Sequence, residues 1–168
     1  CSLCGTSFPA EAIYVCDQCL GPLEVTYDWD GIRGVFSKEL IASRPKSLWR
    51  YRELLPIDNE PLTGFFSGFT PLQRADRLAA ELGMQELWIK DDSVNHPSLS
   101  YKDRVVPVAA TRAVELGFNV FGCASTGNLA NSVAAHAARL GLTCYVFIPE
   151  SLERAKILGS AISGPEVV

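Results

Sequence analysis

A lysine at the predicted start of a helix is the side chain best placed for covalent chemistry in this sequence. Lys102 lies in the segment 97–104, which reads Pro-Ser-Leu-Ser-Tyr-Lys-Asp-Arg. Ser100 and Asp103 resemble a helix-capping pair, and Gly117 is typical of a helix end, so a helix is predicted from about Ser100 or Asp103 to Leu116. The positive end of a helix favours a neutral amine, which is the nucleophilic form of lysine. Lys102 is therefore a candidate nucleophile.

A second polar segment, residues 125–128 (Ser-Thr-Gly-Asn), lies between a predicted strand over 120–124 and a predicted helix over 128–140. Strands that alternate with helices, as they do in this part of the chain, favour parallel pairing. Ligands of parallel sheets bind outside the carboxyl ends of the strands. Both this segment and the loop that leads to Lys102 follow such ends, so the sequence predicts a ligand site there.

Four of the six cysteines form two Cys-x-x-Cys pairs, Cys1 with Cys4 and Cys16 with Cys19, each followed closely by glycine. A tight turn of this kind directs two thiolates at one ion, and glycine accepts the positive φ that the turn needs. The sequence predicts a zinc site that is structural, because four thiolates leave no open coordination position. Two disulfides or four free thiols are the alternatives, and disulfides are disfavoured because no secretory signal is recognised.

The chain is predicted to divide into a zinc-ribbon-like module over 1–30, a helical connector over 31–61 and an α/β region over 62–168. Hydrophobic alternation and turn residues predict the elements of the first two regions. These are a β-hairpin over 8–15, a strand over 23–27, a turn over 28–31, and helices over 36–41 and 47–55.

In the α/β region, Thr70 is predicted to cap a helix that ends at Gly83. Its apolar face would consist of Leu72, Ala75, Leu78, Ala79 and Leu82. The other predicted elements are strands over 86–90, 120–124 and 142–148, a polar loop over 91–99, helices over 100–116, 128–140 and 151–158, and the start of a strand at 167.

Composition narrows the class of protein. The 168 residues are 48% hydrophobic with a mean hydropathy of +0.12 and a net charge of −4. Such a chain can bury a core, and it lacks the basic surface that nucleic acid or an anionic membrane would require. A cytoplasmic protein is expected. The chain begins at Cys1 and closes on an apolar pair typical of a starting strand, so we expect a piece of a longer polypeptide.

Six motifs, in this order, resemble the threonine synthase branch of the fold-type II pyridoxal phosphate (PLP) enzymes. They occupy the chain from about Trp49 to the last residue, and an N-terminal zinc-ribbon-like extension also fits some threonine synthases and relatives such as cysteate synthase. The motifs are Trp-Arg-Tyr at 49–51, Gly-Phe-Thr-Pro-Leu at 68–72, Leu-Trp-Ile-Lys-Asp at 87–91, Ser-Tyr-Lys-Asp-Arg at 100–104, Ser-Thr-Gly-Asn at 125–128 and Tyr-Val-Phe-Ile-Pro at 145–149.

The resemblance implies an incomplete α/β fold of the tryptophan synthase beta type and a role for each site residue. Lys102 would hold PLP covalently and move protons between substrate carbons. Asn128 would bond the 3′-oxygen of the cofactor ring, and Ser125, Thr126 and Gly127 would hold the substrate carboxylate. The chain departs from the family pattern at Leu99, where glycine is usual, and at Val105, which replaces the glycine after Lys-Asp-Arg.

The function implied is that of a PLP-dependent lyase that converts O-phospho-L-homoserine and water to L-threonine and phosphate. The full-length protein would be a homodimer, and the 168-residue piece would be inactive because the loop that grips the PLP phosphate lies in the second half of such enzymes. Cysteate synthase, a threonine dehydratase-like enzyme and a non-catalytic binding module are alternatives. A Rossmann nucleotide site is disfavoured because no G-x-G-x-x-G is present. Of the two histidines, His96 is expected in an exposed loop and His136 to be structural or solvated.

Overall fold

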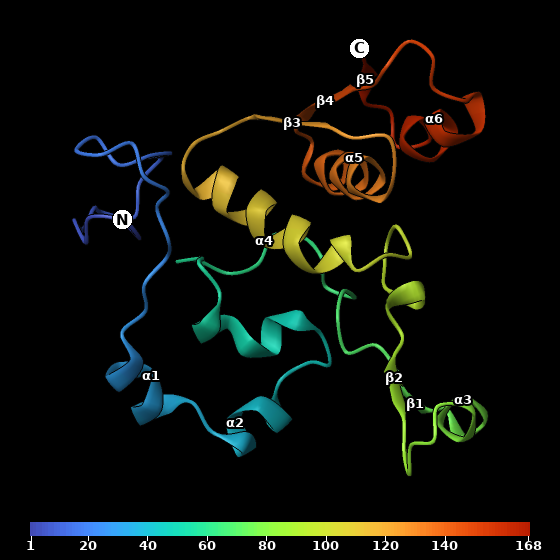
Figure 1. Cartoon of the computed structure of the whole chain (residues 1–168). Coiled ribbons are helices and arrows are strands. Elements are labelled where there is room, and N and C mark those ends of the chain that lie inside the picture. The colour runs from blue at the N-terminus through green and yellow to red at the C-terminus, as the bar shows by residue number, and fades with distance from the viewer.

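The computed structural model describes residues 1–168, with every side chain except that of Lys156. Helix α4 (Lys102–Glu115) crosses the middle of the molecule, between α5 (Asn128–Leu140) on one side and the connector on the other (Figure 1). None of the helices in the described chain is long and apolar enough to span a bilayer. The arrangement makes α4 the element that joins the two halves of the core.

The main sheet contains β3 (Val120–Ala124), β4 (Thr143–Phe147) and β5 (Glu166–Val167) in that order, and both pairs of neighbours are parallel. Helix α5 covers one face of this sheet. The apolar core that joins α5 to this sheet and to Val106 of α4 consists of Val106, Ala130, Val133, Ala134, Ala137, Cys144 and Val146. The parallel pairing predicted from the alternation of strands and helices is confirmed for these three strands.

The connector packs on the other side of α4. Leu48 and Trp49 form a second cluster with Val108, whereas Val106, two residues earlier, belongs to the core under α5. Residues two apart on a helix point about 200° away from each other, so α4 presents opposite faces to the two clusters. The indole of Trp49 donates a 2.9 Å hydrogen bond to the carbonyl of Thr63, which holds the connector in place.

Several predicted elements are present with small shifts in their bounds. Strand β3 and helix α5 have the predicted bounds, and β4, β5 and α4 lie within one or two residues of theirs. Helix α2 (Lys38–Ser43) begins after the Ser37 cap, α6 spans Arg154–Ala161, and the predicted helix over 47–55 is the 3-10 segment η1 (Leu48–Leu54), kinked at Tyr51.

Four predictions about local structure are wrong. No hairpin occurs over 8–15 and no strand over 23–27 in the described chain, where an isolated bridge joins Val15 and Pro22. The predicted turn at 28–31 is part of helix α1 (Trp29–Val35), which Asp28 caps. The predicted helix after Thr70 is divided between a strand, β1 (Leu72–Arg74), and a shorter helix, α3 (Asp76–Glu81).

The strand predicted over 86–90 is β2 (Trp88–Lys90), and it pairs with β1 in an antiparallel two-stranded ribbon outside the main sheet. Pairing with β2 overrides the helical spacing of the apolar residues, because Leu72 pairs through the backbone with Lys90, 18 residues later. The polar loop predicted over 91–99 contains one 3-10 turn, η2 (Asp92–Val94).

Candidate functional site

The candidate lysine is the first residue of α4. The N–H of Lys102 donates a 3.1 Å hydrogen bond to the hydroxyl of Ser100, and its amine lies 4.8 Å from the ring centre of Tyr101. No carboxylate forms an ion pair with this amine in the described part of the chain. Lys102 is half-buried, so its amine is available to a ligand and still in contact with solvent.

The loop before α4 is held in place by Asn95, whose side chain is 1% exposed. Its Oδ1 accepts a 2.7 Å hydrogen bond from the N–H of Gly68, and its Nδ2 donates a 3.0 Å bond to the carbonyl of Ser100. Within this loop Leu99 has φ +57°, a left-handed conformation that favours glycine. Position 99, where the resemblance leads us to expect glycine, is therefore one at which the backbone needs glycine-like freedom.

The segment 125–128 forms the turn between β3 and α5. Ser125 Oγ accepts a 3.3 Å hydrogen bond from the N–H of Gly127, and no side chain in the described chain caps the start of the helix. A Cβ added to Gly127 would meet no protein atom within 4 Å, and Thr126 and Asn128 are exposed. The start of α5 therefore has no side-chain cap and is open beside Gly127, which suits an anion site at a helix N-terminus.

Asp103 joins the two predicted halves of the site. It follows Lys102, and its Oδ1 accepts a 2.5 Å hydrogen bond from Ser132, which lies one turn after Asn128. The starts of α4 and α5 are thus brought together, although no hydrogen bond links Lys102 to Asn128 among the described residues. The predicted capping pair, in which Asp103 would bond back to Ser100, does not form. Oδ2 of Asp103 instead accepts hydrogen bonds from the N–H (2.9 Å) and the hydroxyl (2.8 Å) of Ser98.

Sequence reasoning did not identify the ion pair beneath this site. The Arg104 guanidinium contacts both oxygens of Asp92, and its Nη2 also donates to the hydroxyl of Thr70 at 2.9 Å. The Arg104 hydrogen bonds are the largest cause that lowers the pKa of Asp92, to about 2. The pair ties α4 to the 3-10 turn η2, which follows β2. The Lys-Asp-Arg triplet was the available signal, because Arg104 adds a second positive charge two residues after Lys102 and such a charge is stabilised by a carboxylate partner.

A cavity of about 780 Å³ lies elsewhere, between the N-terminal module, the connector and the C-terminal half of α4. Its lining includes Ala10, Ile57 and Leu116, and neither Lys102 nor Asn128 contributes to it. The chemistry of the side chains, rather than the size of this cavity, therefore locates the candidate site.

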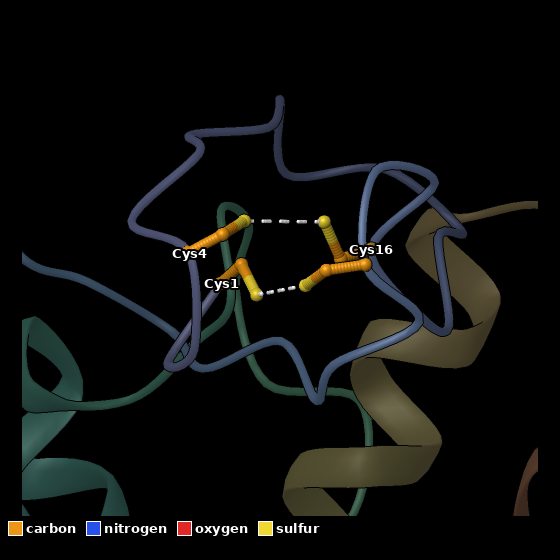
Figure 2. A group of neighbouring side chains, drawn as sticks. Cys1, Cys4 and Cys16 are labelled. Atoms are coloured by element: carbon orange, nitrogen blue, oxygen red, sulfur yellow. Dashed lines mark hydrogen bonds between the residues drawn. The ribbon is translucent and has the colours of Figure 1, made fainter.

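The four N-terminal cysteines form a second candidate site. Figure 2 shows the side chains of Cys1, Cys4 and Cys16 gathered in one place. The sulfur of Cys4 lies 3.6 Å from that of Cys16, and the sulfur of Cys1 lies 3.5 Å from that of Cys19. All four ligand atoms lie within 4.8 Å of one another. Zinc–sulfur bonds of about 2.3 Å in a tetrahedron place the sulfurs about 3.8 Å apart. The cluster therefore has the size of a four-thiolate zinc site.

Local turns rather than strands build this cluster. Gly5 has φ +77°, as predicted for a tight turn, but in the second turn Leu20 and not Gly21 is left-handed, with φ +57°. A Cβ on Gly21 would lie 2.9 Å from Leu3 and 3.1 Å from the sulfur of Cys1, so this glycine is needed for close approach. The N–H of Leu3 points at the sulfur of Cys1 at 3.4 Å.

The thiols of the cluster differ in acidity. Hydrogen bonds from the side chain and backbone of Thr6, and then from Cys16 and Cys19, lower the pKa of Cys4 to about 6. A thiolate at this position is what a metal ligand requires. By contrast, burial raises the pKa of both Cys123 and Cys144, which lie in β3 and β4 as small apolar residues, as predicted.

Comparison with known proteins identifies the class to which this fold and site belong. The sequence pattern of the family described as "Pyridoxal-phosphate dependent enzyme" matches residues 65–168. The chain belongs to this family, and its fold is that of the fold-type II members. A fungal L-serine ammonia-lyase from Rhizomucor miehei superposes with a TM-score of 0.54 and 24% identity, over 61% of this chain and 33% of that one.

Curated relatives specify the branch further. The chain is 41% identical to the threonine synthase of Methanocaldococcus jannaschii over 100% of its own length and 42% of that protein. It is 36% identical to the threonine synthase of Methanosarcina acetivorans, again over 100% of its length and 41% of that protein. The chain thus spans about two fifths of the length of these relatives.

The residues at the starts of α4 and α5 fit PLP. The amine of Lys102 is free of ion pairs among the described residues, so it is available to the cofactor aldehyde. The uncapped start of α5 and the open space beside Gly127 suit an anionic or phenolic oxygen.

Proposed function

We propose that the full-length protein is a PLP-dependent threonine synthase that converts O-phospho-L-homoserine and water to L-threonine and phosphate. The observation that carries this proposal is the 41% identity to a threonine synthase across the whole length of this chain. The length of the relatives means that the proposal concerns the full-length protein.

The formulas of substrate and product define what the protein must do. The bond between Cγ and the phosphate oxygen breaks, a water oxygen is added at Cβ, and Cγ gains a hydrogen. Protons must therefore be taken from some substrate carbons and returned to others, which needs a basic group that stays beside the substrate. Bound PLP would supply an electron sink for the negative charge that develops on the substrate carbons.

We assign Lys102 the roles of holding the cofactor and moving these protons. Lys102 is a half-buried residue at the start of α4, and its amine forms no ion pair within the described chain, which leaves the amine available to cofactor and substrate. We assign Asn128 to the 3′-oxygen of the cofactor ring. The amide of Asn128 is exposed at the start of α5, which supports this role.

Ser125, Thr126 and Gly127 are proposed to hold the substrate carboxylate. The turn that they form ends at the uncapped N-terminus of α5, where N–H groups and the positive end of the helix favour an anion. The four-cysteine cluster is proposed to hold one structural zinc ion, because four thiolates leave no position for a substrate. A homodimer for the full-length protein remains a prediction of the resemblance.

The proposal is tested with the full-length protein, by following phosphate release and threonine formation from O-phospho-L-homoserine. Lys102→Ala is expected to lose both turnover and the borohydride-reducible PLP adduct, whereas Lys38→Ala, at an exposed position on α2, keeps both. An adduct of unchanged stoichiometry in Lys102→Ala would assign the chemistry to another lysine. Formation of cysteate, or deamination of threonine, without turnover of O-phospho-L-homoserine would support the alternative enzymes of the family. No PLP adduct and no turnover would support a binding module.

A further inference from the structure

A buried histidine lies behind the residue that follows Lys102. Asp103 is 0% exposed and His136, on α5, is 1% exposed. The ring Nε2 of His136 is 3.6 Å from Oδ1 of Asp103, and its Nδ1 is 2.8 Å from the hydroxyl oxygen of Thr63. The assigned roles of Lys102, Asn128 and the 125–127 turn use neither His136 nor Asp103.

Thr63 and Asp103, the polar neighbours of the two ring nitrogens, together favour one position for the ring proton. If Thr63 donates to Nδ1 of His136, the single proton of the neutral ring is on Nε2 and faces the carboxylate of Asp103. The other tautomer would direct a nitrogen lone pair at that carboxylate, which is repulsive. Nε2 lies 3.6 Å from Oδ1 of Asp103 and has no closer polar partner among the described side chains, so the carboxylate is the group that this N–H faces. The network thus favours the Nε2–H form.

The environment of Asp103 is built to keep a buried carboxylate charged. Burial would raise the pKa of this carboxyl, but the donors of His136, Ser132 and Ser98 outweigh it, and the pKa lies below its ordinary value. Buried carboxylates are tolerated when all their lone pairs face donors, and they become costly when one donor is removed. The charge of Asp103 therefore depends on each of these partners.

The same carboxylate connects three segments of the site. It accepts hydrogen bonds from Ser98 in the loop before α4 and from Ser132 in α5, and it belongs to the first turn of α4 itself. The segment with Lys102 and the helix with Asn128 thus share one buried anchor. A shift of this anchor would move the lysine relative to the start of α5.

We propose that Asp103 and His136 are positioning residues for Lys102: the imidazole orients the carboxylate, and the carboxylate holds the first turn of α4 against α5. This inference rests on the proposed function, because it assumes that Lys102 is the lysine that binds the cofactor. It predicts that disturbing His136 slows attachment of PLP to Lys102 without weakening the initial binding of PLP.

The experiment measures how fast full-length protein, freed of cofactor, attaches PLP to Lys102. Borohydride trapping at several PLP concentrations, followed by mass spectrometry of the peptide, separates the maximal rate from the half-saturating concentration. His136→Phe keeps an aromatic ring without a donor, and its maximal rate is expected to fall roughly 10- to 100-fold, the effect of a misplacement of about 1 Å. The half-saturating concentration should change little.

Two comparisons distinguish positioning from stability. His136→Gln can still direct an N–H at Asp103, so it is expected to recover most of the rate. Thr111→Val is the matched control: Thr111 is a fully buried polar residue of α4 that is bonded to the N–H of Leu62 and not to Asp103. It should melt at a lower temperature and label Lys102 at the wild-type rate, measured well below the melting temperature of every variant.

Each outcome supports or overturns a defined statement. Wild-type protein labelled at Lys102, with His136→Phe equally fast, overturns the positioning role and leaves the proposed function intact. Wild-type protein that is not labelled at Lys102 overturns both. If His136→Phe does not fold, Ser132→Ala tests the same anchor with a smaller change, because it removes only the bond to α5. A wild-type rate in Ser132→Ala would then overturn the inference, and a slower rate at unchanged half-saturation would support it.

Discussion

Arg104, two residues after Lys102, forms a two-point ion pair with Asp92, with Nε 2.6 Å from Oδ2 and Nη2 2.7 Å from Oδ1. The hydroxyl of Thr70 adds a third polar group, donating to Asp92 at 2.6 Å. A paired guanidinium and carboxylate is more directional than a single contact of unlike charges. The geometry couples the start of α4 to the segment that follows β2.

Arg104→Gln is expected to destabilise the full-length protein by about 1 kcal/mol at neutral pH, a value reduced by solvent screening of the partly exposed pair. The pKa of Asp92 is lowered from 3.8 to about 2, so the ion pair stabilises the fold above its ordinary pKa. The contribution is lost as pH falls from about 4 to about 2, because the carboxyl becomes protonated in the folded state. The stability difference between wild type and Arg104→Gln should therefore shrink over this range in thermal unfolding.

Arg33→Gln is the matched control for this effect. Its pair with Asp30 is 2.9 Å long, but the two side chains are 78% and 93% exposed, so its loss should change stability very little at any pH. A difference between wild type and Arg104→Gln that is the same at pH 3 and pH 7 would contradict the role assigned to Asp92.

The cysteine cluster leads to a prediction about metal content. Protein purified without chelators should contain about one zinc ion per chain, because the four sulfurs have the spacing of a tetrahedral site. Cys16→Ala should lose the ion, since Cys16 is the buried member of the cluster. Cys144→Ala, which removes a buried thiol from β4, should retain it. Elemental analysis measures all three proteins, and a folded wild type that contains no metal would refute the zinc site.

The part of the fold that the sequence predicted best is the unit from β3 to β4. Its signals are local: an apolar strand, a helix with a regular apolar face, and Gly141, which adopts φ +68° at the end of α5. The wrong predictions concern structure that depends on distant partners. The spacing from Leu72 to Leu82 suits a helix, and nothing within that window shows that Leu72 pairs with Lys90.

The candidate site was predictable to a similar degree. Lys102 and the 125–128 turn could be named because each has a recognisable residue pattern beside a helix start. Their connection depends on Ser132 and Asp103, which are 29 residues apart and carry no local signal of contact. His136 was expected to be structural or solvated, and the structure places it in the core, whereas His96 is exposed, as predicted. A single histidine in a helix does not reveal which buried carboxylate it faces.

The left-handed backbone at Leu99 leads to a prediction about stability. A residue with a Cβ is strained at φ +57°, and Leu99 is 58% exposed, so its side chain gains little from burial. Leu99→Gly should therefore stabilise the full-length protein by about 0.5–1 kcal/mol, the relief of strain less the greater freedom of glycine in the unfolded chain. Leu99→Ala keeps the strain and serves as the control. Urea unfolding that shows no gain for glycine over alanine would contradict this account.

One face of the main sheet has no covering layer in the 168 residues. Val120, Tyr145 and Phe147 point away from α5 and are 50%, 37% and 49% exposed. Parallel sheets are normally covered on both faces, because their strands are apolar throughout. A polypeptide of residues 1–168 is therefore expected to self-associate through this face, and to retain PLP weakly with no turnover of O-phospho-L-homoserine.

Gel filtration and light scattering of that polypeptide over a range of concentrations test the first expectation. Replacing Tyr145 and Phe147 together by Ser should shift it toward monomer, because the exposed apolar area falls. Ile162→Ser, at a residue that is 88% exposed outside this face, should not. Retention of PLP and turnover are then compared with the full-length protein. Comparable turnover by both would show that the site is complete within residues 1–168, contrary to our expectation, since Lys102 and Asn128 are assigned only to the aldehyde and 3′-oxygen side of the cofactor.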